Sequence, residues 1–318
     1  MKVIVTGAAG FIGSHVVDRL LKDGHDVAGL DNFDPFYDPI QKRDNLTQAL
    51  GNPRFELVEG DIRDFGLLTA LFDRFQPKAV IHLAAKAGVR PSLEDPALYM
   101  DVNVTGTTRV FEAARLLGQP PRVVYASSSS VYGDRDMAPF RESENVDSPI
   151  SPYAASKRAC EILASTFHHL YGLNLTGLRF FTAYGPRNRP DLAVSKFSRL
   201  ILEDQTIPVF GDGSTRRDYT YVEDIADGVV KAMHQCHGLH LYNLGNSSPV
   251  ALTELISTIA KALGRVPRLK HLPTQPGDVR QTFADISLAE TELGFRPSMD
   301  FAEGIQRYVE WLLARQGA

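Results

Sequence analysis

Short apolar runs alternate with amphipathic helical patterns through the first part of the chain. The runs are Val3–Val5, Val27–Leu30, Phe55–Val58, Ala79–Leu83, Val123–Ala126 and Leu175–Phe180. Runs of this kind are typical of strands buried on both faces, and the helical patterns between them are typical of crossover connections. We therefore predict an α/β fold with a Rossmann-type, doubly wound parallel sheet. A last amphipathic pattern, Phe301–Leu313, predicts a surface helix.

Three glycines, Gly7, Gly10 and Gly13, follow the first predicted strand at three-residue intervals. Glycine reaches backbone angles that other residues avoid, lets the main chain approach a pyrophosphate, and permits close packing of helix on strand. The helix predicted to continue through Leu21 would then offer its free N–H groups to the anion. The second strand ends at Asp31, whose carboxylate is placed to bind both ribose hydroxyls of an adenosine and to repel a 2′-phosphate. The pattern predicts a dinucleotide site that prefers NAD to NADP.

Polar, Gly-rich or Ser-rich segments follow several other predicted strands, where the ligands of parallel sheets gather. They are Gly60–Ile62, Ala84–Gly88 and Ser127–Ser130. Asp61 is placed to accept a hydrogen bond from the adenine amino group, or else to cap a helix in the way that Asp64 can.

The character of the sequence changes after Tyr184, where turn-rich, charged segments separate short helices and strands. We expect an NAD-binding domain of residues 1–183 plus about 216–245. A smaller α/β substrate-binding lobe is expected from about 184–215 and 246–318. The chain is expected to return to the main sheet near Tyr219–Val222 and near Leu241–Leu244.

Composition argues against several classes of partner. The formal net charge of the 318 residues is −4, with no basic stripe for a polyanion, so we expect no nucleic acid partner. No apolar run is long enough to span a membrane, so we expect no membrane partner. The glycine turn lies so close to Met1 that a cleavable leader would take the first strand with it, which predicts a cytoplasmic chain. Cys160 and Cys236 suit a reducing compartment, and the nine histidines show no metal-ligand spacing, so we expect no metal site.

Tyr153 and Lys157 are four residues apart, which places them one turn apart on one face of a helix that Ser151-Pro152 begins. A phenol with an ordinary pKa of about 10 is a poor base at neutral pH. A neighbouring ammonium and the positive charge of an oxidised nicotinamide would both stabilise the phenolate. Ser128 is placed to share the moving proton, although the serine run has an alternative interpretation as a strand-ending turn.

Motifs spread over essentially the whole chain resemble those of extended short-chain dehydrogenases/reductases, in the group of nucleotide-sugar epimerases and dehydratases. The motifs are Thr6–Gly13, His82–Ala85, Ser127–Gly133, Tyr153–Lys157, Arg179–Phe181, and Arg217–Tyr219 leading to Val222–Asp224. The resemblance implies a catalytic triad of Ser128, Tyr153 and Lys157. It also implies that Asn103 supports the active site and that Phe180–Tyr184 walls the nicotinamide and sugar pocket.

The glycine turn, the strand ends and the resemblance together define the expected contacts to NAD. These are Gly7, Gly10, Phe11, Ile12, Gly13, Asp31, Asn32, Asp61, Ile62, Leu83, Ala84, Ala85, Lys86, Asn103, Tyr153, Lys157 and Phe180. Because members of the group commonly dimerise, a homodimer through helices spanning 97–117 and 153–171 is expected.

The resemblance implies a reaction that begins with hydride removal from C4 of a nucleotide-linked sugar. Dehydratases of the group carry Asp-Glu directly after the serine or threonine, and uronate decarboxylases carry a glutamate in this stretch. Here Ser129 and Ser130 stand in those places and have no useful acidity. Elimination and decarboxylation are therefore disfavoured, and C4 epimerisation, in which the 4-keto sugar rotates and regains the same hydride, is favoured. A nonenzymatic NAD-binding sensor is the alternative from another class, although such proteins generally lose the tyrosine or lysine.

The segments Asp31–Pro39 and Phe181–Asp191 most resemble those of UDP-glucuronate 4-epimerases, with UDP-glucose/UDP-galactose 4-epimerases as the alternative. By resemblance, hydroxyls would bind the sugar carboxylate and Arg189 would reach sugar hydroxyls or phosphate. Arg189 also has an alternative interpretation as part of a charged turn. Neutral donors that hold the carboxylate without supplying an acid would favour rotation over loss of CO₂. The expected hydroxyls are those of Ser128, Ser129, Ser130 and Thr182.

The nucleotide end of the substrate is expected to contact arginines, apolar side chains and one aspartate. A guanidinium fork suits paired phosphate oxygens, so Arg90 and Arg217 are candidate pyrophosphate ligands, and Val209-Phe210 can pack against the uracil. By resemblance, Asp278 holds the uridine ribose. Related epimerases often have an arginine three residues before that aspartate, where this chain has glutamine, and Arg280 is expected to supply the charge instead.

Overall fold

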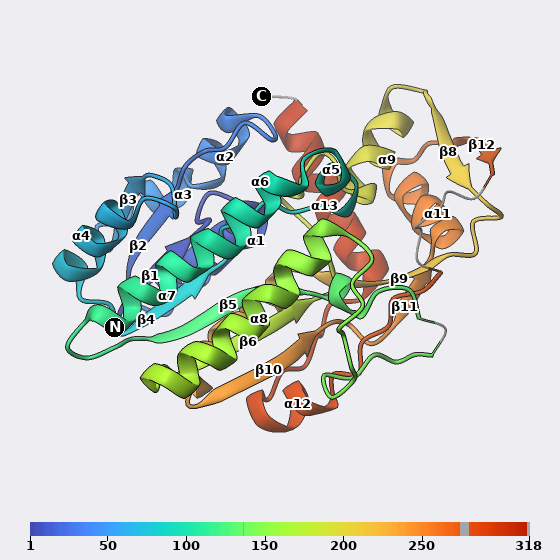
Figure 1. Ribbon diagram of the computed structural model, residues 1–318. Helices are drawn as coiled ribbons and strands as arrows, with labels where there is room; N and C mark the ends of the chain where they lie inside the picture. Colours follow the sequence, from blue (N-terminus) through green and yellow to red (C-terminus); the bar gives the residue numbers. More distant parts are fainter. Residues whose placement is uncertain (136, 274–279, 317–318) are drawn as a thin grey trace.

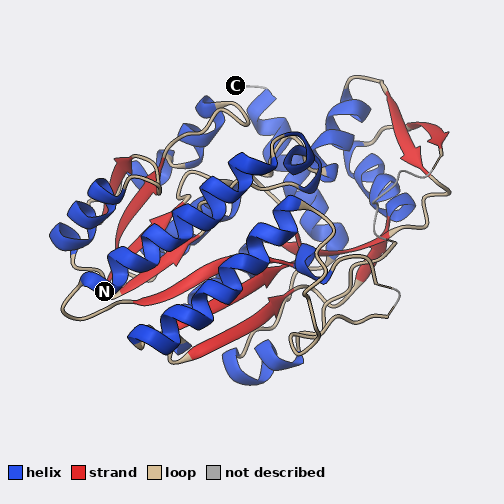
Figure 2. Ribbon diagram, viewed as in Figure 1, coloured by secondary structure: helices blue, strands red, loops and turns tan. Residues whose placement is uncertain are grey.

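The computed structural model describes residues 1–135, 137–273 and 280–316. Its largest feature is a parallel seven-stranded sheet in the order β3-β2-β1-β4-β5-β6-β10 (Figures 1 and 2). The predicted Rossmann-type sheet is confirmed. The strand order reverses between β1 and β4, which is the switch point at which ligands of such sheets bind. The strands are β1 (Lys2–Thr6), β2 (Asp26–Asp31), β3 (Phe55–Glu59), β4 (Ala79–His82), β5 (Arg122–Ser128), β6 (Leu175–Phe180) and β10 (Leu239–Leu244).

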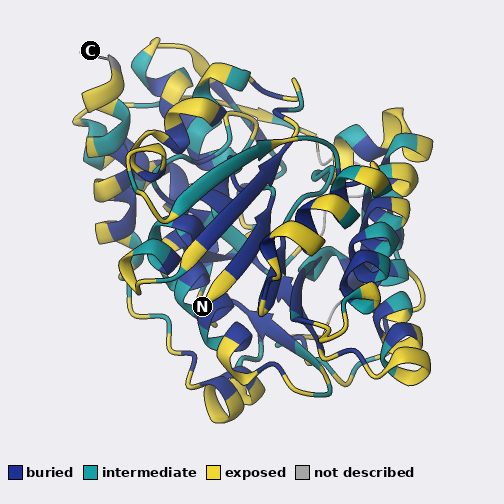
Figure 3. Ribbon diagram, turned by 90° about the vertical axis from the view of Figure 1, so that its left-hand side faces the viewer, coloured by how far each residue is buried: buried dark blue, intermediate teal, exposed yellow. Residues whose placement is uncertain are grey.

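Helices cover both faces of this sheet, and the apolar strands are buried between them (Figure 3). α1 (Phe11–Lys22), α10 (Val222–Gln235) and α12 (Ser287–Leu293) pack on one face. α4 (Phe65–Phe75), α7 (Gly106–Leu116) and α8 (Pro152–Tyr171) pack on the other and lie in front of the sheet in Figure 1. No described helix has both the length and the apolar character needed to cross a membrane. The shorter helices are α2 (Pro39–Asn45), α3 (Thr47–Leu50), α5 (Val89–Glu94), α6 (Pro96–Met100), a π-helical turn (Asp101–Thr105) and a 3₁₀ turn (Ser129–Tyr132).

A smaller group of elements packs around a separate apolar core beyond the carboxyl ends of the main strands. It contains a three-stranded sheet, β11-β9-β7, and a two-stranded parallel sheet, β12-β8. The predicted surface helix near the carboxyl terminus is confirmed and runs to Gln316. The elements are β7 (Thr182–Tyr184), α9 (Ala193–Leu202), β8 (Thr206–Phe210), β9 (Arg216–Tyr221), β11 (Pro249–Ala251), α11 (Leu252–Leu263), β12 (Arg268–Leu272) and α13 (Phe301–Gln316).

One predicted strand position is wrong. Leu241–Leu244 returns to the main sheet as β10, but Tyr219–Val222 does not return to it. β10 already occupies the place beside β6, with Leu244 paired to Phe180. β7 continues past the end of β6 and offers a new edge, to which β9 pairs in parallel. β9 and β10 both end in a buried stretch, and the pairing shows which of them belongs to the main sheet.

Candidate active site

The glycine turn after β1 is too tight to admit side chains. Gly7 has a φ of +71°, and a Cβ on it would lie 2.7 Å from the backbone nitrogen of Ala84. A Cβ on Gly13 would lie 1.9 Å from the carbonyl oxygen of Gly7, so α1 packs directly against the turn. Gly10 precedes α1 and supplies no capping side chain to its first N–H groups. The turn is therefore a backbone cradle that suits a pyrophosphate.

A cavity of about 440 Å³ opens over this turn and over the carboxyl ends of β2, β4, β5 and β6. The strand order brings these ends together from distant parts of the chain. Within the described ranges, no group of three or more His, Cys, Asp or Glu residues could hold a metal ion. The predicted residues that line the cavity are Gly7, Gly10, Phe11, Ile12, Gly13, Asp31, Asn32, Asp61, Ile62, Leu83, Ala84, Ala85, Lys86, Ser128, Ser129, Ser130, Tyr153, Lys157, Phe180, Thr182 and Arg189.

Asp31 is buried at the end of β2, where its carboxylate borders the cavity. It accepts hydrogen bonds from the backbone N–H groups of Ala9 (2.9 Å) and Phe33 (2.8 Å), one on each oxygen. Burial raises its pKa. Each carboxylate oxygen retains a further lone pair, so the group is still able to accept hydrogen bonds from a ligand.

Asp61 is held by two side chains at the end of β3. It accepts hydrogen bonds from Asn32 (3.0 Å) and from Arg63 (2.8 Å), and the hydrogen bond from Arg63 lowers its pKa to about 2. The helix-capping alternative is wrong for Asp61, because Asp64 caps α4 by accepting from the N–H of Leu67. Asp61 is therefore a charged acceptor on the cavity wall at neutral pH.

The three predicted catalytic residues border the same cavity. α8 begins at Pro152, which places Tyr153 in its first turn and Lys157 one turn later, both beside the end of β5 where Ser128 lies. The ammonium of Lys157 donates a hydrogen bond to the carbonyl oxygen of Ala126 (2.8 Å), which holds it at that strand end. The arrangement combines a phenol, a cation and a hydroxyl, which are the groups needed to move a proton.

The serine run forms the turn that ends β5. Ser128 accepts a hydrogen bond from the N–H of Ser130 (3.2 Å), and its hydroxyl lies 3.2 Å from that of Ser130. Ser128 is paired in register with Phe180 of β6, and Thr182 begins β7 two residues further on. The structure thus brings the four predicted hydroxyls to one wall of the cavity. The serine run is also the strand-ending turn of the alternative interpretation, because the residues that form the turn line the cavity.

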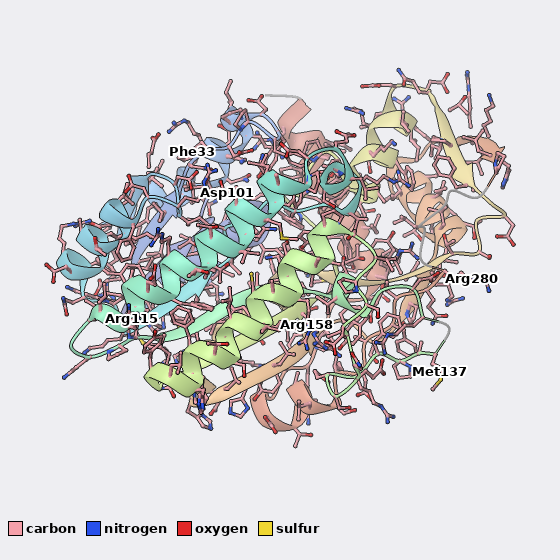
Figure 4. All side chains as sticks on the ribbon, in the orientation of Figure 1. Phe33, Asp101, Arg115, Met137, Arg158 and Arg280 are labelled. Atoms are coloured by element: carbon pink, nitrogen blue, oxygen red, sulfur yellow. The ribbon has the colours of Figure 1, made fainter. Side chains whose placement is uncertain are left out.

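A buried ion pair behind this wall was not predicted. Glu161 lies one turn after Lys157 on α8 and accepts two hydrogen bonds from Arg179, at 2.8 and 2.9 Å. Glu161 also accepts a hydrogen bond from the hydroxyl of Ser127 (2.6 Å) and lies 3.2 Å from Arg158, which is labelled in Figure 4. The four-residue spacing of the catalytic pair continues to Glu161, and that spacing was the signal available in the sequence.

Asn103 is placed behind the cavity rather than on its wall. It is 1% exposed and lies in the π-helical turn before α7. Its amide accepts from the backbone N–H of Lys86 (2.8 Å) and donates to the carbonyl oxygen of Lys86 (3.0 Å) and to the hydroxyl of Ser156 (2.9 Å). The expected direct contact to NAD is therefore replaced by a positioning function, in which Asn103 holds the Lys86 backbone against α8.

The residues predicted for the uracil lie in the smaller lobe. Val209 is 0% exposed within its core, so the expected side-chain contact with uracil is wrong for this residue. Side chains alternate along β8, which leaves Phe210 as the more accessible of the two. The guanidinium of Arg90 lies 5.9 Å from the ring centroid of Phe210, so the structure brings these two predicted residues together, outside the cavity lining.

The other nucleotide residues gather around β9. Arg217 donates a hydrogen bond to the carbonyl oxygen of Arg216 (2.9 Å), and the N–H of Arg216 donates to the carbonyl oxygen of Arg280 (3.0 Å). Arg280 is exposed at the margin of the molecule (Figure 4). Neither arginine lines the cavity, and Asp278 lies outside the described residues. The uridine contacts therefore stay predictions.

Several lining residues were not among the predicted ligands. They come from the loop after β2, from α2 and from the segment before α9, and some of their contacts are distant in the chain, such as the hydrogen bond from Lys86 to Asp34, 52 residues apart. No local spacing marks such contacts, which is why motif analysis missed them. They are Asp34, Phe36, Tyr37, Lys42 and Asp191.

Comparisons with known proteins agree with this geometry. The model of a family described as GDP-mannose 4,6 dehydratase matches residues 4–308. A UDP-glucuronate 4-epimerase of Thermodesulfobacterium geofontis is 40% identical over 97% of this chain and 95% of its own length. UDP-glucuronate 4-epimerase 5 of Arabidopsis thaliana is 42% identical over 98% of this chain and 76% of its own. The crystal structure of UDP-glucuronic acid 4-epimerase from Bacillus cereus, in complex with UDP-glucuronic acid and NAD, is similar with a TM-score of 0.92, at 33% identity over 99% of this chain and 100% of that one.

A parallel sheet with this strand order, a glycine turn and a tyrosine–lysine pair at its cavity define an extended short-chain dehydrogenase/reductase. Within that class, the chain belongs to the family described as GDP-mannose 4,6 dehydratase. The resemblance inferred from the motifs is confirmed.

Proposed function

We propose that this protein is an NAD-dependent 4-epimerase of UDP-sugars and that it interconverts UDP-glucuronate and UDP-galacturonate. Relatives of that name at 40% and 42% identity support it, as does the similarity to the Bacillus cereus enzyme bound to UDP-glucuronic acid and NAD. The observation that carries the proposal is the composition of the cavity. It combines a phenol, an ammonium and a row of hydroxyls with carboxylates that are all engaged by protein groups.

The residues around the cavity fit NAD. The Gly7–Gly13 turn suits the pyrophosphate, Asp31 suits the adenosine ribose hydroxyls, and Asp61 is a charged acceptor for the adenine amino group. Tyr153 and Lys157 then border the nicotinamide end. NAD, when bound, supplies the hydride acceptor at the sugar C4 and returns the hydride to it.

Tyr153 accepts the proton of the sugar 4-hydroxyl as oxidation proceeds and gives it back when the 4-keto group is reduced. Ser128 bonds to the same oxygen and steadies it during the transfer. Lys157 is fixed by its hydrogen bond to Ala126 and keeps a positive charge beside the phenolate. The three residues thus serve both halves of the reaction without net loss of a proton.

The acidic residues of the cavity argue for epimerisation over elimination. A 4,6-elimination needs a free acid for the departing water and a base for the C5 proton. Every described acid in the lining is instead bound by protein groups, three of them in ion pairs, with Arg63 (2.8 Å), Lys86 (2.8 Å) and Arg189 (2.6 Å). The four acids are Asp31, Asp34, Asp61 and Asp191.

A row of neutral hydroxyls suits a sugar carboxylate. Ser128, Ser129, Ser130 and Thr182 come from two adjacent strand ends and line one wall. A 4-keto uronate is a β-keto acid that loses CO₂ readily, and donors that hold its carboxylate without protonating it leave rotation as the faster course. Arg189 lines the same cavity and is placed to bind sugar hydroxyls or phosphate.

We infer that residues 1–183 with about 216–245 form the NAD-binding domain, and that about 184–215 with 246–318 form the UDP-sugar-binding lobe. The second apolar core, around α9, β8, α11 and α13, supports the existence of that lobe, although β9 also contributes to this core and α12 packs on the main sheet. Arg90, Phe210, Arg217, Asp278 and Arg280 are proposed to bind the uridine diphosphate. The common position of Arg217 and Arg280 beside β9 supports the proposal that both bind the same part of the substrate.

A homodimer through α7 and α8 is proposed for the assembled enzyme. Exposed apolar side chains on these helices support it: Leu116 (56%), Ile162 (53%), Leu170 (60%) and Tyr171 (47%). We further infer a cytoplasmic location, supported by two cysteines, Cys160 and Cys236, that are buried and unbonded.

The direct test is a substrate panel of UDP-glucuronate, UDP-glucose and UDP-N-acetylglucosamine, followed by NMR of the anomeric protons. We expect UDP-glucuronate to be converted most efficiently, with UDP-galacturonate as product. A preference for UDP-glucose would assign the alternative sugar. A pentose or a 6-deoxy product would contradict the argument from Ser129 and Ser130, and the absence of any product would favour a nonenzymatic sensor.

A further inference from the structure

The loop between β2 and α2, residues 32–38, brings a tyrosine to the cavity that the proposed chemistry does not use. Tyr37 is 9% exposed and lines the cavity. Its hydroxyl oxygen is buried and has no hydrogen-bond partner within the described part of the chain. Because a buried hydroxyl without a partner is costly, the position calls for a partner that the protein itself does not supply.

The hydroxyl is held in place by a loop with its own internal hydrogen bonds. The N–H of Asp34 donates to the side chain of Asn32 (3.1 Å), and the N–H of Phe36 donates to the side chain of Asp34 (2.9 Å). Lys42 of α2 donates to the carbonyl oxygen of Asp34 (2.7 Å), and its ammonium lies 4.6 Å from the ring centroid of Tyr37. The phenol is therefore oriented in advance of any ligand.

The charges around Tyr37 indicate which part of a ligand it faces. Burial, together with the charge of Asp31, raises the pKa of Tyr37 above its ordinary value, so the group stays a neutral donor. Asp31 is also the residue placed for the adenosine ribose, and the charges of the paired Arg189 and Asp191 reach the phenol from the other side chains nearby. The hydroxyl is thus near the sugar and phosphate part of a dinucleotide whose pyrophosphate lies on the glycine turn.

The same loop joins two sides of the cavity. The ring of Phe36 lies near two cations, with the guanidinium of Arg189 5.2 Å and the ammonium of Lys86 5.6 Å from its centroid. Lys86 also forms an ion pair with Asp34 (2.8 Å), and Arg189 donates to the carbonyl oxygen of Ala87 (3.3 Å). The contacts connect the loop to the segment after β4 and to the segment before α9.

We propose that Tyr37 is a cofactor-binding residue whose hydroxyl donates a hydrogen bond to a ribose or phosphate oxygen of the dinucleotide. Phe36, packed near Arg189 and Lys86, holds the loop of residues 32–38 closed over that dinucleotide and slows its release. The inference rests on the proposed function in one respect, that the dinucleotide is NAD. It accounts for an enzyme that regenerates its cofactor in every turnover and has no need to release it.

The test is the release of labelled NAD from purified Tyr37→Phe protein, chased with excess unlabelled NAD. We expect release to be about tenfold faster than from the wild type, the size expected for one hydrogen bond. Tyr171→Phe is the control, because that tyrosine lies at the far end of α8 and does not line the cavity, and its release rate should equal the wild type. Phe36→Ala tests the closure of the loop separately and should also speed NAD release several-fold.

Three results would overturn the inference. Unchanged NAD release from both Tyr37→Phe and Phe36→Ala would show that the loop does not retain NAD, although the protein still binds it. A raised KM for the UDP-sugar with unchanged NAD release would assign Tyr37 to the substrate. A wild-type protein that binds no NAD would overturn both the proposed function and the proposed role of the loop. This result differs from the first two, in which NAD still binds.

Discussion

Tyr153 is the residue on which the proposed proton transfer depends. Tyr153→Phe retains the ring and removes only the hydroxyl, so NAD should remain bound to the purified protein. Turnover should fall by about 100- to 10,000-fold, the usual contribution of a general base. The measurement is C4 epimer formation by NMR together with the absorbance of bound cofactor.

Tyr99 provides a matched control for that substitution. Its ring packs edge-on against Tyr153, 6.2 Å between centroids, and burial raises its pKa to about 12, so it stays protonated at neutral pH. Tyr99→Phe should keep turnover within a few-fold of the wild type. Near-normal activity of Tyr153→Phe, or an equal loss in both variants, would mean that Tyr153 is not the base.

His82 makes stability depend on pH. It is buried at the end of β4 between the hydroxyls of Thr6 (2.7 Å) and Thr107 (3.0 Å), and burial, with the charge of Lys157, lowers its pKa to about 3. The unfolded chain binds this proton at about pH 6.5, so stability falls as the pH drops below that value. Between about pH 7.5 and about pH 5, the expected loss from this group is about 2 kcal/mol.

His82→Asn retains a neutral hydrogen-bonding side chain and should reduce that loss by about 2 kcal/mol, measured as the free energy of urea unfolding at the two pH values. His169→Asn, at an exposed position of α8, is the control and should not alter the pH dependence. Equal pH dependence in His82→Asn and the wild type would mean that His82 does not control it.

The residues that sequence analysis placed correctly at the cavity belong to local patterns. Tyr153 and Lys157 are related by one helical turn, and the Gly7–Gly13 turn is contained in one strand–helix junction. Tyr37 was missed because no spacing in the sequence shows that its loop folds over the cavity. Phe36 was missed because its partners, Lys86 and Arg189, are distant in the chain. Contacts of that kind depend on the order of the strands, which no local spacing encodes.

Among the elements, α8 is joined to β6 by the Glu161–Arg179 ion pair, in which both side chains are almost fully buried. Glu161→Gln keeps the shape and removes the negative charge, which leaves Arg179 buried without a counter-charge. The free energy of unfolding should fall by about 3–5 kcal/mol in a urea titration. Because Ser127 also bonds to Glu161, kcat should fall more than NAD affinity.

Glu112→Gln is the control at the element scale. It breaks a surface ion pair with Arg109 on α7, whose side chains are 25% and 41% exposed, and should change stability by less than about 1 kcal/mol. If Glu161→Gln were no more destabilising than Glu112→Gln, the buried pair would not be what holds α8 to the sheet.

Strands could be predicted from the sequence where they are short apolar runs. The sheet to which a strand belongs could not be predicted, because it depends on which strand it pairs with. The strands of the main sheet are short apolar runs and were recognised as such. β9 is a mixed strand, RRDYTY, whose last four residues are buried, and it pairs with β7, which extends past the sheet. Val209 shows the same limit at one position, because the inward or outward face of β8 depends on the core formed with α9 and α11.

For the whole molecule, the alternation of strands and helices was enough to predict the Rossmann-type sheet. The smaller lobe was harder to define from the sequence, because its core unites segments as far apart as β7 and α13. The smaller lobe lies beyond the carboxyl ends of the main strands, so residues of that lobe, such as Arg189 and Leu192, line the NAD cavity. We therefore expect oxidation and reduction of the sugar to take place in this one cavity.

The measurement that tests this expectation most directly is the fate of a deuterium placed at C4 of UDP-glucuronate. We expect UDP-galacturonate that retains the label at C4, even in the presence of excess unlabelled NAD and NADH, because the same hydride returns to the opposite face of the sugar. Loss of the label to solvent or to the added cofactor, at a rate comparable to turnover, would contradict it.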